Sequence, residues 1–239
     1  MRKLSICTEP YDEGLRIYEK DEIEIREGLT VLVGCNGSGK TTLLRVLKDK
    51  LKGENIPVLL YDNTQRDSSK SKRNAMLEGD ISLIASSMVS SEGENIIINM
   101  GCVAKDIGKF VRSGRNEDDF TRAFRDIKGI KDDEVKEVGE YWILLDAVDS
   151  GLSVDNVLDL KKYLFTPIME DIRKKGKEVY IVVSANEYEM CRGEQCFDVQ
   201  LGEYVDIKGY EDFRELVLRS REKKDKILDE YDKRRGING

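Results

Sequence analysis

A glycine-rich segment constrains this chain more than any other feature of its sequence. Residues 34–41 read Gly-Cys-Asn-Gly-Ser-Gly-Lys-Thr, which fits the pattern of a glycine, four residues, and then Gly-Lys-Ser/Thr. The apolar run at 29–33 indicates a buried strand before the segment, and leucines at helical spacing follow it. A strand, a glycine-rich turn and a helix in this order predict a loop whose backbone N–H groups surround phosphate oxygens.

The residue types in this loop suit ATP bound with magnesium. We expect Gly37 and Gly39 to let the backbone approach the phosphates, and Lys40 to reach the β- and γ-phosphates. Thr41 is expected to ligate magnesium through its hydroxyl, and Thr42 to bond the α-phosphate. The candidate nucleotide-binding residues of the loop are Asn36, Gly37, Ser38, Gly39, Lys40, Thr41 and Thr42.

A second phosphate-side element is an acidic residue at the end of an apolar run. Residues 141–145 read Tyr-Trp-Ile-Leu-Leu and are followed by Asp146. If this run is a strand near the glycine-rich loop, Asp146 can hold magnesium directly or through water. The alternative is an ordinary aspartate at the end of a strand.

Patterns along the chain predict an α/β fold of the P-loop NTPase type. Residues 15–25 alternate apolar and charged side chains, as half-buried antiparallel strands do. Further buried strands are expected at 56–61, 141–145 and 178–183, with a helix at 156–175. This order predicts a mostly parallel sheet with flanking helices and an N-terminal antiparallel β portion.

The charge pattern divides the chain into one domain and a C-terminal helix. We expect an ATPase domain at 1–209, in which the charged segment 113–140 is a mobile insertion. Residues 210–239 are strongly charged with a thin apolar stripe, which indicates a helix that docks or binds a partner.

Tyr11 and Tyr18 are candidates for stacking on adenine, although either could pack on the sheet instead.

The composition excludes several classes of function. The 239 residues include no histidine, which excludes Ser-His-Asp and Cys-His mechanisms and leaves carboxylates, Lys, Ser/Thr and bound ions. The five cysteines are scattered and odd in number, which favours free thiols in a reducing compartment. No apolar run is long enough for a bilayer span or a signal peptide, so a cytoplasmic protein without membrane insertion is expected. The net charge of −7 argues against a surface that binds nucleic acid all over. The basic patch 70–73 could bind it locally, but a solvated loop is the favoured interpretation.

Three segments together resemble the ABC-type ATPases, the class that includes transporter motors and the SMC- and RecF-like DNA-maintenance ATPases. Residues 34–44 look like the P-loop of that family, and residues 144–153 are similar to its Walker B strand and D-loop. Between them, Ser91 and Gly93 match variant signature motifs of the SMC- and RecF-like branch. Gln65 is a candidate for the family's magnesium-contacting Q-loop glutamine.

The resemblance implies an ATP-dependent homodimer whose partner is a nucleic acid or an effector protein. In such ATPases, the signature serine and glycine of one copy cap the ATP on the P-loop of the other. Ser91 and Gly93 would then complete the nucleotide site, and Gln65 would join Thr41 and Asp146 as a metal ligand. The alternative for the signature segment is a helix N-cap with a capping glutamate.

Two positions depart from the family pattern. Ala147 stands where the family has its general-base glutamate, and Ala185 aligns with its switch histidine. A methyl group cannot orient or deprotonate water, so hydrolysis is slow, or Asp149 or Glu187 serves instead, or Ala147 is an engineered replacement that traps the ATP state. The candidate catalytic residues are Lys40, Asp146 and Asp149.

These observations favour a stand-alone ABC-type ATPase of the SMC- and RecF-like branch, from a phage or mobile element. The interval between the P-loop and the signature segment leaves no room for a long coiled coil. One alternative is the nucleotide-binding subunit of a membrane transporter, although the Leu-Ser-Gly-Gly-Gln signature is absent. A second is an ATP sensor without significant turnover, and a weaker third is a small-molecule kinase.

Overall fold

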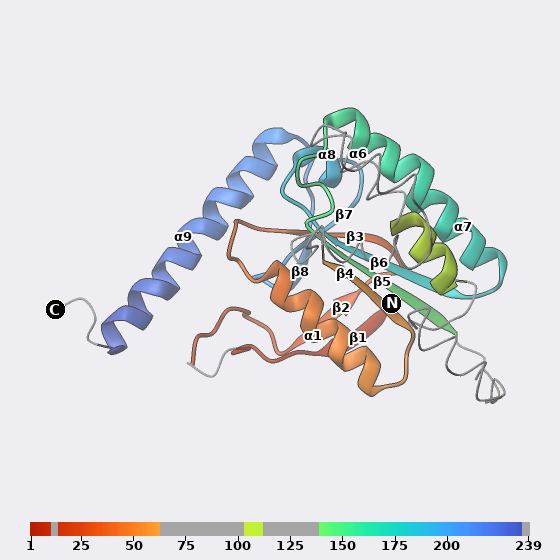
Figure 1. Ribbon diagram of the computed structural model, residues 1–239. Helices are drawn as coiled ribbons and strands as arrows, with labels where there is room; N and C mark the ends of the chain where they lie inside the picture. The colour runs from red at the N-terminus through yellow and green to blue at the C-terminus, as the bar shows by residue number, and fades with distance from the viewer. Residues whose placement is uncertain (11–13, 63–102, 112–138, 236–239) are drawn as a thin grey trace, which may run out of the picture.

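The computed structural model describes residues 1–10, 14–62, 103–111 and 139–235 (Figure 1). The strands are β1 (Arg2–Ser5), β2 (Glu22–Ile25), β3 (Gly28–Val33), β4 (Val58–Asp62), β5 (Glu140–Asp146), β6 (Glu178–Ser184), β7 (Gln195–Asp198) and β8 (Glu203–Val205). The helices are α1 (Lys40–Gly53), α6 (Val154–Leu160), η1 (Lys161–Phe165, a π-helical turn), α7 (Thr166–Lys174), α8 (Tyr188–Cys191) and α9 (Tyr210–Arg235). Residues 103–111 are also helical.

A mixed sheet of six strands forms the centre, in the order β4-β5-β6-β3-β7-β8. Every neighbouring pair in it is parallel except β7 and β8, which are antiparallel. A separate antiparallel pair joins β1 to β2, with Arg2 opposite Ile25. These arrangements confirm the predicted α/β fold with a mostly parallel sheet and an N-terminal antiparallel portion.

The strand residues bury alternate side chains on the two faces of the sheet. In β5, Trp142 and Leu144 join the core on the α1 side, whereas Ile143 and Leu145 join the core on the α6 and α7 side. Figure 1 shows α1 covering one face, with α6 and α7 on the other. Because both faces are covered, the parallel strands are apolar almost throughout, which is why their positions could be predicted from apolar runs.

The expectation of strands across 15–25 is only partly correct. Residues 22–25 form β2, but residues 15–20 form no strand. Instead, Ile17 donates its backbone N–H to the carbonyl of Thr8, and the side chains of Ile17 and Tyr18 are buried. The alternating pattern there reflects side chains packed under a loop rather than a ladder of strand hydrogen bonds.

The parallel strands bring their C-terminal ends to one edge of the sheet. The register sets Leu32 beside Ser184 and Leu145 beside Val183, so the segments that follow β3, β5 and β6 leave the same edge. This edge is where α/β sheets bind ligands. Residues 113–138 of the predicted insertion at 113–140 lie outside the described residues. Within the described part of the chain, no helix combines the length and apolar character that crossing a bilayer requires.

Candidate nucleotide-binding site

The loop between β3 and α1 has a backbone that only glycine adopts without strain. Gly34, Gly37 and Gly39 have φ values of 145°, 80° and 97°. A Cβ atom on Gly39 would lie 2.9 Å from Cγ2 of Ile17, and one on Gly34 would lie 2.6 Å from the hydroxyl of Ser38. The glycines are therefore required both for the turn and for the close packing around it.

Lys40, the first residue of α1, holds the loop from inside. Its ammonium donates to the carbonyl of Gly34 at 2.7 Å and to that of Cys35 at 3.1 Å. The side chain is nearly buried, and this burial lowers the pKa of Lys40, while the negative charges of Asp149 and Asp146 oppose that shift. The ammonium of Lys40 is thus fixed beneath the glycine-rich loop, where it can attract an anion.

Asp146 ends β5 and faces this loop with one oxygen unused. It is 2% exposed, and its Oδ1 accepts a hydrogen bond from the hydroxyl of Ser184 at 2.5 Å. The same hydroxyl accepts the backbone N–H of Ala147 at 2.7 Å. Among the described residues, neither Oδ2 of Asp146 nor the hydroxyl of Ser38 has a hydrogen-bond partner. Buried polar atoms without partners are rare, so a ligand or ion is the natural partner for both.

Asp149 joins the segment after β5 to the end of β6. Its Oδ2 accepts the backbone N–H groups of Asn186 and Glu187, each at 2.8 Å. The residue is 0% exposed, and burial raises the pKa of its carboxyl above 3.8 despite these two hydrogen bonds. Oδ1 has no hydrogen-bond partner among the described residues. One oxygen of Asp149 therefore has a structural role, and only the other is available for chemistry.

The structure brings together the predicted residues that it describes. Thr41 and Thr42 occupy the first turn of α1, half-buried, and Asn36 and Gly37 are exposed at the tip of the loop. Three other predicted residues, Gln65, Ser91 and Gly93, lie outside the described residues, so their assignment remains a prediction.

Tyr18 packs beneath the loop, which favours the packing alternative over adenine stacking. Its hydroxyl donates to the carbonyl of Gly39 at 2.8 Å, and the ring is 1% exposed. A Cβ on Gly39 would come within 3.1 Å of this ring. Such a ring has no free face for a base. Tyr11, the other candidate, lies outside the described residues.

Two residues of α9 that were not predicted from the sequence contact the loop, and Gln200 bonds one of them. The hydroxyl of Ser220, on α9, accepts the backbone N–H of Cys35 at 3.0 Å and donates to Oε1 of Gln200 at 2.7 Å. Lys224, one turn further along α9, donates to the carbonyl of Asn36 at 3.4 Å. The signal for Ser220 in the sequence was its spacing, because it continues the apolar stripe of α9 after Phe213 and Leu216.

These groups fit ATP with magnesium. Lys40 and the loop amides suit phosphate oxygens, and Thr41 with the unpartnered oxygen of Asp146 suits a hard cation. The described residues contain no group of three or more His, Cys, Asp and Glu side chains that could hold a metal alone. Magnesium is commonly held by one or two carboxylates together with substrate phosphates, so this donor set agrees with such a site.

Gly39→Ala should destabilise the protein. The new methyl group would meet Ile17 and Tyr18 at a φ that L-residues avoid, so we expect a loss of about 1–3 kcal/mol in the free energy of unfolding. Urea unfolding measures this loss. Gly53→Ala is the matched control, because a Cβ there meets nothing within 4 Å, and it should change stability by no more than about 1 kcal/mol. Equal stability of the two variants would contradict the packing described for Gly39.

Asp149→Asn should change how stability depends on pH. Because the folded pKa of Asp149 is raised, its carboxyl contributes stability that is present below pH 3.8 and is lost as pH rises through the folded pKa. The unfolding free energy of the unmodified protein minus that of the variant should therefore fall as pH rises. Urea unfolding in EDTA between pH 4 and pH 7 measures it. Asp159→Asn, at an exposed position of α6, is the control, and the same trend in both variants would refute the prediction.

Comparison with known proteins agrees with the geometry. Residues 13–235 match the family described as AAA domain. A stretch of 35 residues is 57% identical to the "DNA double-strand break repair Rad50 ATPase" of Methanopyrus kandleri, covering 15% of this chain and 4% of that protein. Another of 76 residues is 44% identical to the "Putative HMP/thiamine import ATP-binding protein YkoD" of Bacillus subtilis, covering 30% of this chain and 14% of that protein. The matches thus span only a small part of either relative. The chain belongs to the AAA domain family and is an ABC- and SMC-like P-loop ATPase.

Proposed function

We propose that this ATPase binds ATP with magnesium, forms a homodimer around the nucleotide and hydrolyses it slowly. The observation that supports this most is the pairing, at one edge of the sheet, of a glycine loop around Lys40 with a buried aspartate that has an unused oxygen. A cation and phosphate groups are the ligands that such a pair takes.

Each residue of the site has a distinct proposed role. Lys40 and the loop amides bind the β- and γ-phosphates, while Thr41 and Asp146 hold magnesium, which supplies charge neutralisation at the phosphates. Ser184 orients Asp146 through the hydrogen bond at its Oδ1, leaving Oδ2 for the metal. We also propose that Gln65 contacts the metal.

Dimerisation rests on the signature segment of a second copy. We propose that Ser91 and Gly93 of that copy close over the γ-phosphate, whose oxygens ADP lacks. ATP would then favour the dimer and ADP would release it, because a ligand shifts an equilibrium only through its different affinity for the two states.

The partner that we favour is a nucleic acid or a protein that acts on one. The relative from Methanopyrus kandleri is described as a DNA double-strand break repair ATPase, and its match has the higher identity. A second candidate function, the nucleotide-binding subunit of a transporter, is favoured by the match to an import ATP-binding protein. The two differ in what the ATP-bound dimer would bind, a nucleic acid or a membrane permease.

The alanines that follow β5 and β6 support the proposal of slow hydrolysis. Ala147 has a φ of 49° and its N–H is occupied by Ser184, so neither its backbone donor nor its methyl group can direct a water molecule. Ala185, at the end of β6, is buried and equally inert. If the rate of hydrolysis is negligible, the protein acts as an ATP sensor.

The dimer proposal predicts a change of mass on ATP binding. We expect light scattering after size exclusion to give twice the mass with ATP and magnesium as with ADP and magnesium. Lys40→Ala should prevent the change by removing the cation under the loop, and Ser91→Arg should prevent it while leaving binding of a fluorescent ATP analogue intact. An unchanged mass at saturating ATP would refute ATP-dependent dimerisation, and no binding of the analogue would refute the function itself.

Restoring a carboxylate at position 147 should accelerate hydrolysis. General-base catalysis contributes about 10²–10⁴-fold, so Ala147→Glu should raise phosphate release by at least tenfold. Ala147→Gln, which has the same size without a base, is the matched control and should stay at the native rate. Rapid phosphate release by the unmodified chain would refute slow turnover and with it the sensor alternative.

A further inference from the structure

Helix α9 packs against the end of the sheet that carries the phosphate-binding loop. Its first turns are anchored by Phe213 and Leu216, which are buried in the core on the α6 and α7 side. The ring of Tyr188 lies 5.9 Å from that of Tyr210 and 6.0 Å from that of Phe213. Figure 1 shows the helix running from this anchor past the start of α1, with its C-terminal end away from the sheet.

A buried polar network connects the middle of α9 to the loop. Ser220 is 3% exposed and Gln200 is 2% exposed, so water has little access to the hydrogen bonds between Cys35, Ser220 and Gln200. The Ser220 hydroxyl accepts from one partner and donates to the other, which uses its donor fully. A polar network of this kind is stable only while all its members are paired, so its geometry is specified closely.

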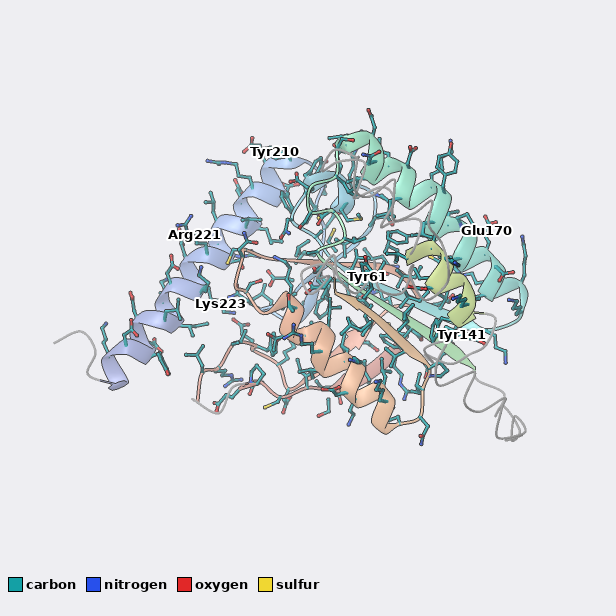
Figure 2. The ribbon with its side chains drawn as sticks, viewed as in Figure 1. Tyr61, Tyr141, Glu170, Tyr210, Arg221 and Lys223 are labelled. Carbon is teal, nitrogen blue, oxygen red and sulfur yellow. The ribbon has the colours of Figure 1, made fainter. Side chains whose placement is uncertain are left out.

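Charged side chains fix the same part of α9 to the flanks of the loop. Arg219 pairs with the buried Asp198 at 3.0 Å, where β7 ends. Lys223 pairs with Glu19, in the segment that packs beneath the loop. Figure 2 shows Lys223 on the side of the helix toward the body of the protein and Arg221 on the outer side.

Lys224 contacts the tip of the loop itself. Its ammonium reaches the carbonyl of Asn36, and its Cδ lies 3.4 Å from where a Cβ of Gly37 would be. The first half of the loop is therefore held by Lys40 from inside and by two residues of α9 from outside.

We propose that Ser220 and Lys224 are positioning residues for the phosphate-binding loop, so that docking of α9 and nucleotide binding are coupled. The inference rests on the proposed function, because it needs a nucleotide in the loop. A loop already held in its binding conformation loses less entropy when the ligand binds. Coupling between two sites is reciprocal, so a nucleotide that fixes the loop must also tighten α9.

The coupling connects the exposed C-terminal end of α9 to nucleotide affinity. The helix continues for three turns beyond Lys224, and these turns include the exposed Leu228. A force or contact that shifted this end would strain the Ser220 network and change nucleotide affinity. The nucleotide would in turn change how firmly the helix is docked.

Two variants on α9 test the proposal by affinity for a fluorescent ATP analogue with magnesium. Ser220→Ala leaves the N–H of Cys35 and Oε1 of Gln200 unpaired, and we expect about three- to tenfold weaker binding. Lys224→Ala, at a partly exposed position, should weaken binding about two- to threefold. The matched control on the same helix is Arg221→Ala. The side chain of Arg221 is exposed and pairs with Asp225 rather than with the loop, so this variant should bind the ATP analogue with unchanged affinity.

A second control and a second measurement separate positioning from general stability. Ile172→Val, at a buried position of α7, lowers stability by about 0.5–1.5 kcal/mol without touching the loop and should bind the analogue normally. Hydrogen exchange should show that nucleotide slows exchange of α9 amides in the unmodified protein and in Arg221→Ala, but not in Ser220→Ala.

The outcomes distinguish this inference from the proposed function. If the unmodified protein binds the analogue and both Ser220→Ala and Lys224→Ala bind it equally well, the coupling is refuted and the function stands. Exchange of α9 that is insensitive to nucleotide refutes the coupling in the same way. If the unmodified protein binds no nucleotide, the function and the coupling fail together.

Discussion

The conformation of one loop is the constraint on which the rest of this structure depends. Gly34, Gly37 and Gly39 adopt dihedral angles that favour glycine, and the carbonyls of Gly34 and Cys35 point toward Lys40. Lys40 satisfies two of those carbonyls, while Tyr18 and Ser220 hold the loop from opposite sides. Segments distant in the sequence therefore converge on a stretch that could not keep its shape alone.

Three of the buried polar atoms without a hydrogen-bond partner among the described residues belong to the loop and to the segment at the end of β5, and their cost indicates a ligand there. A buried acceptor or donor without a partner costs about 1–3 kcal/mol, which is a large share of the stability of an ordinary domain. In the described residues, Ser38, Asp146 and Asp149 each have one such atom, and all three belong to the predicted motifs. A phosphate group and its cation would recover part of this cost by bonding these atoms. If the three residues had only a structural role, the cost would remain.

Sequence predicted the parts of this site that local chemistry determines. The glycine loop, its flanking strand and helix, and Asp146 at the end of β5 follow from patterns within a few residues. Strand order could not be derived, because it depends on packing between segments, and the short strands β7 and β8 have too few residues for a clear period. Ser220 gave no signal of its own, since a serine on a charged helix indicates solvent unless its partner is known.

The same geometry bears on whether Asp149 or Glu187 could serve as a general base, because position 147 is alanine. Asp149 has a raised pKa, which a base needs, but one of its oxygens is committed to the N–H groups of Asn186 and Glu187. Moving it toward a water molecule would break both hydrogen bonds and release the end of β6. Glu187 is exposed, so packing does not hold its carboxylate in the fixed orientation that proton transfer requires. Glu187 is not held in place, and Asp149 could turn toward a water molecule only by losing its two hydrogen bonds, which supports the proposed slow turnover over a substitute base.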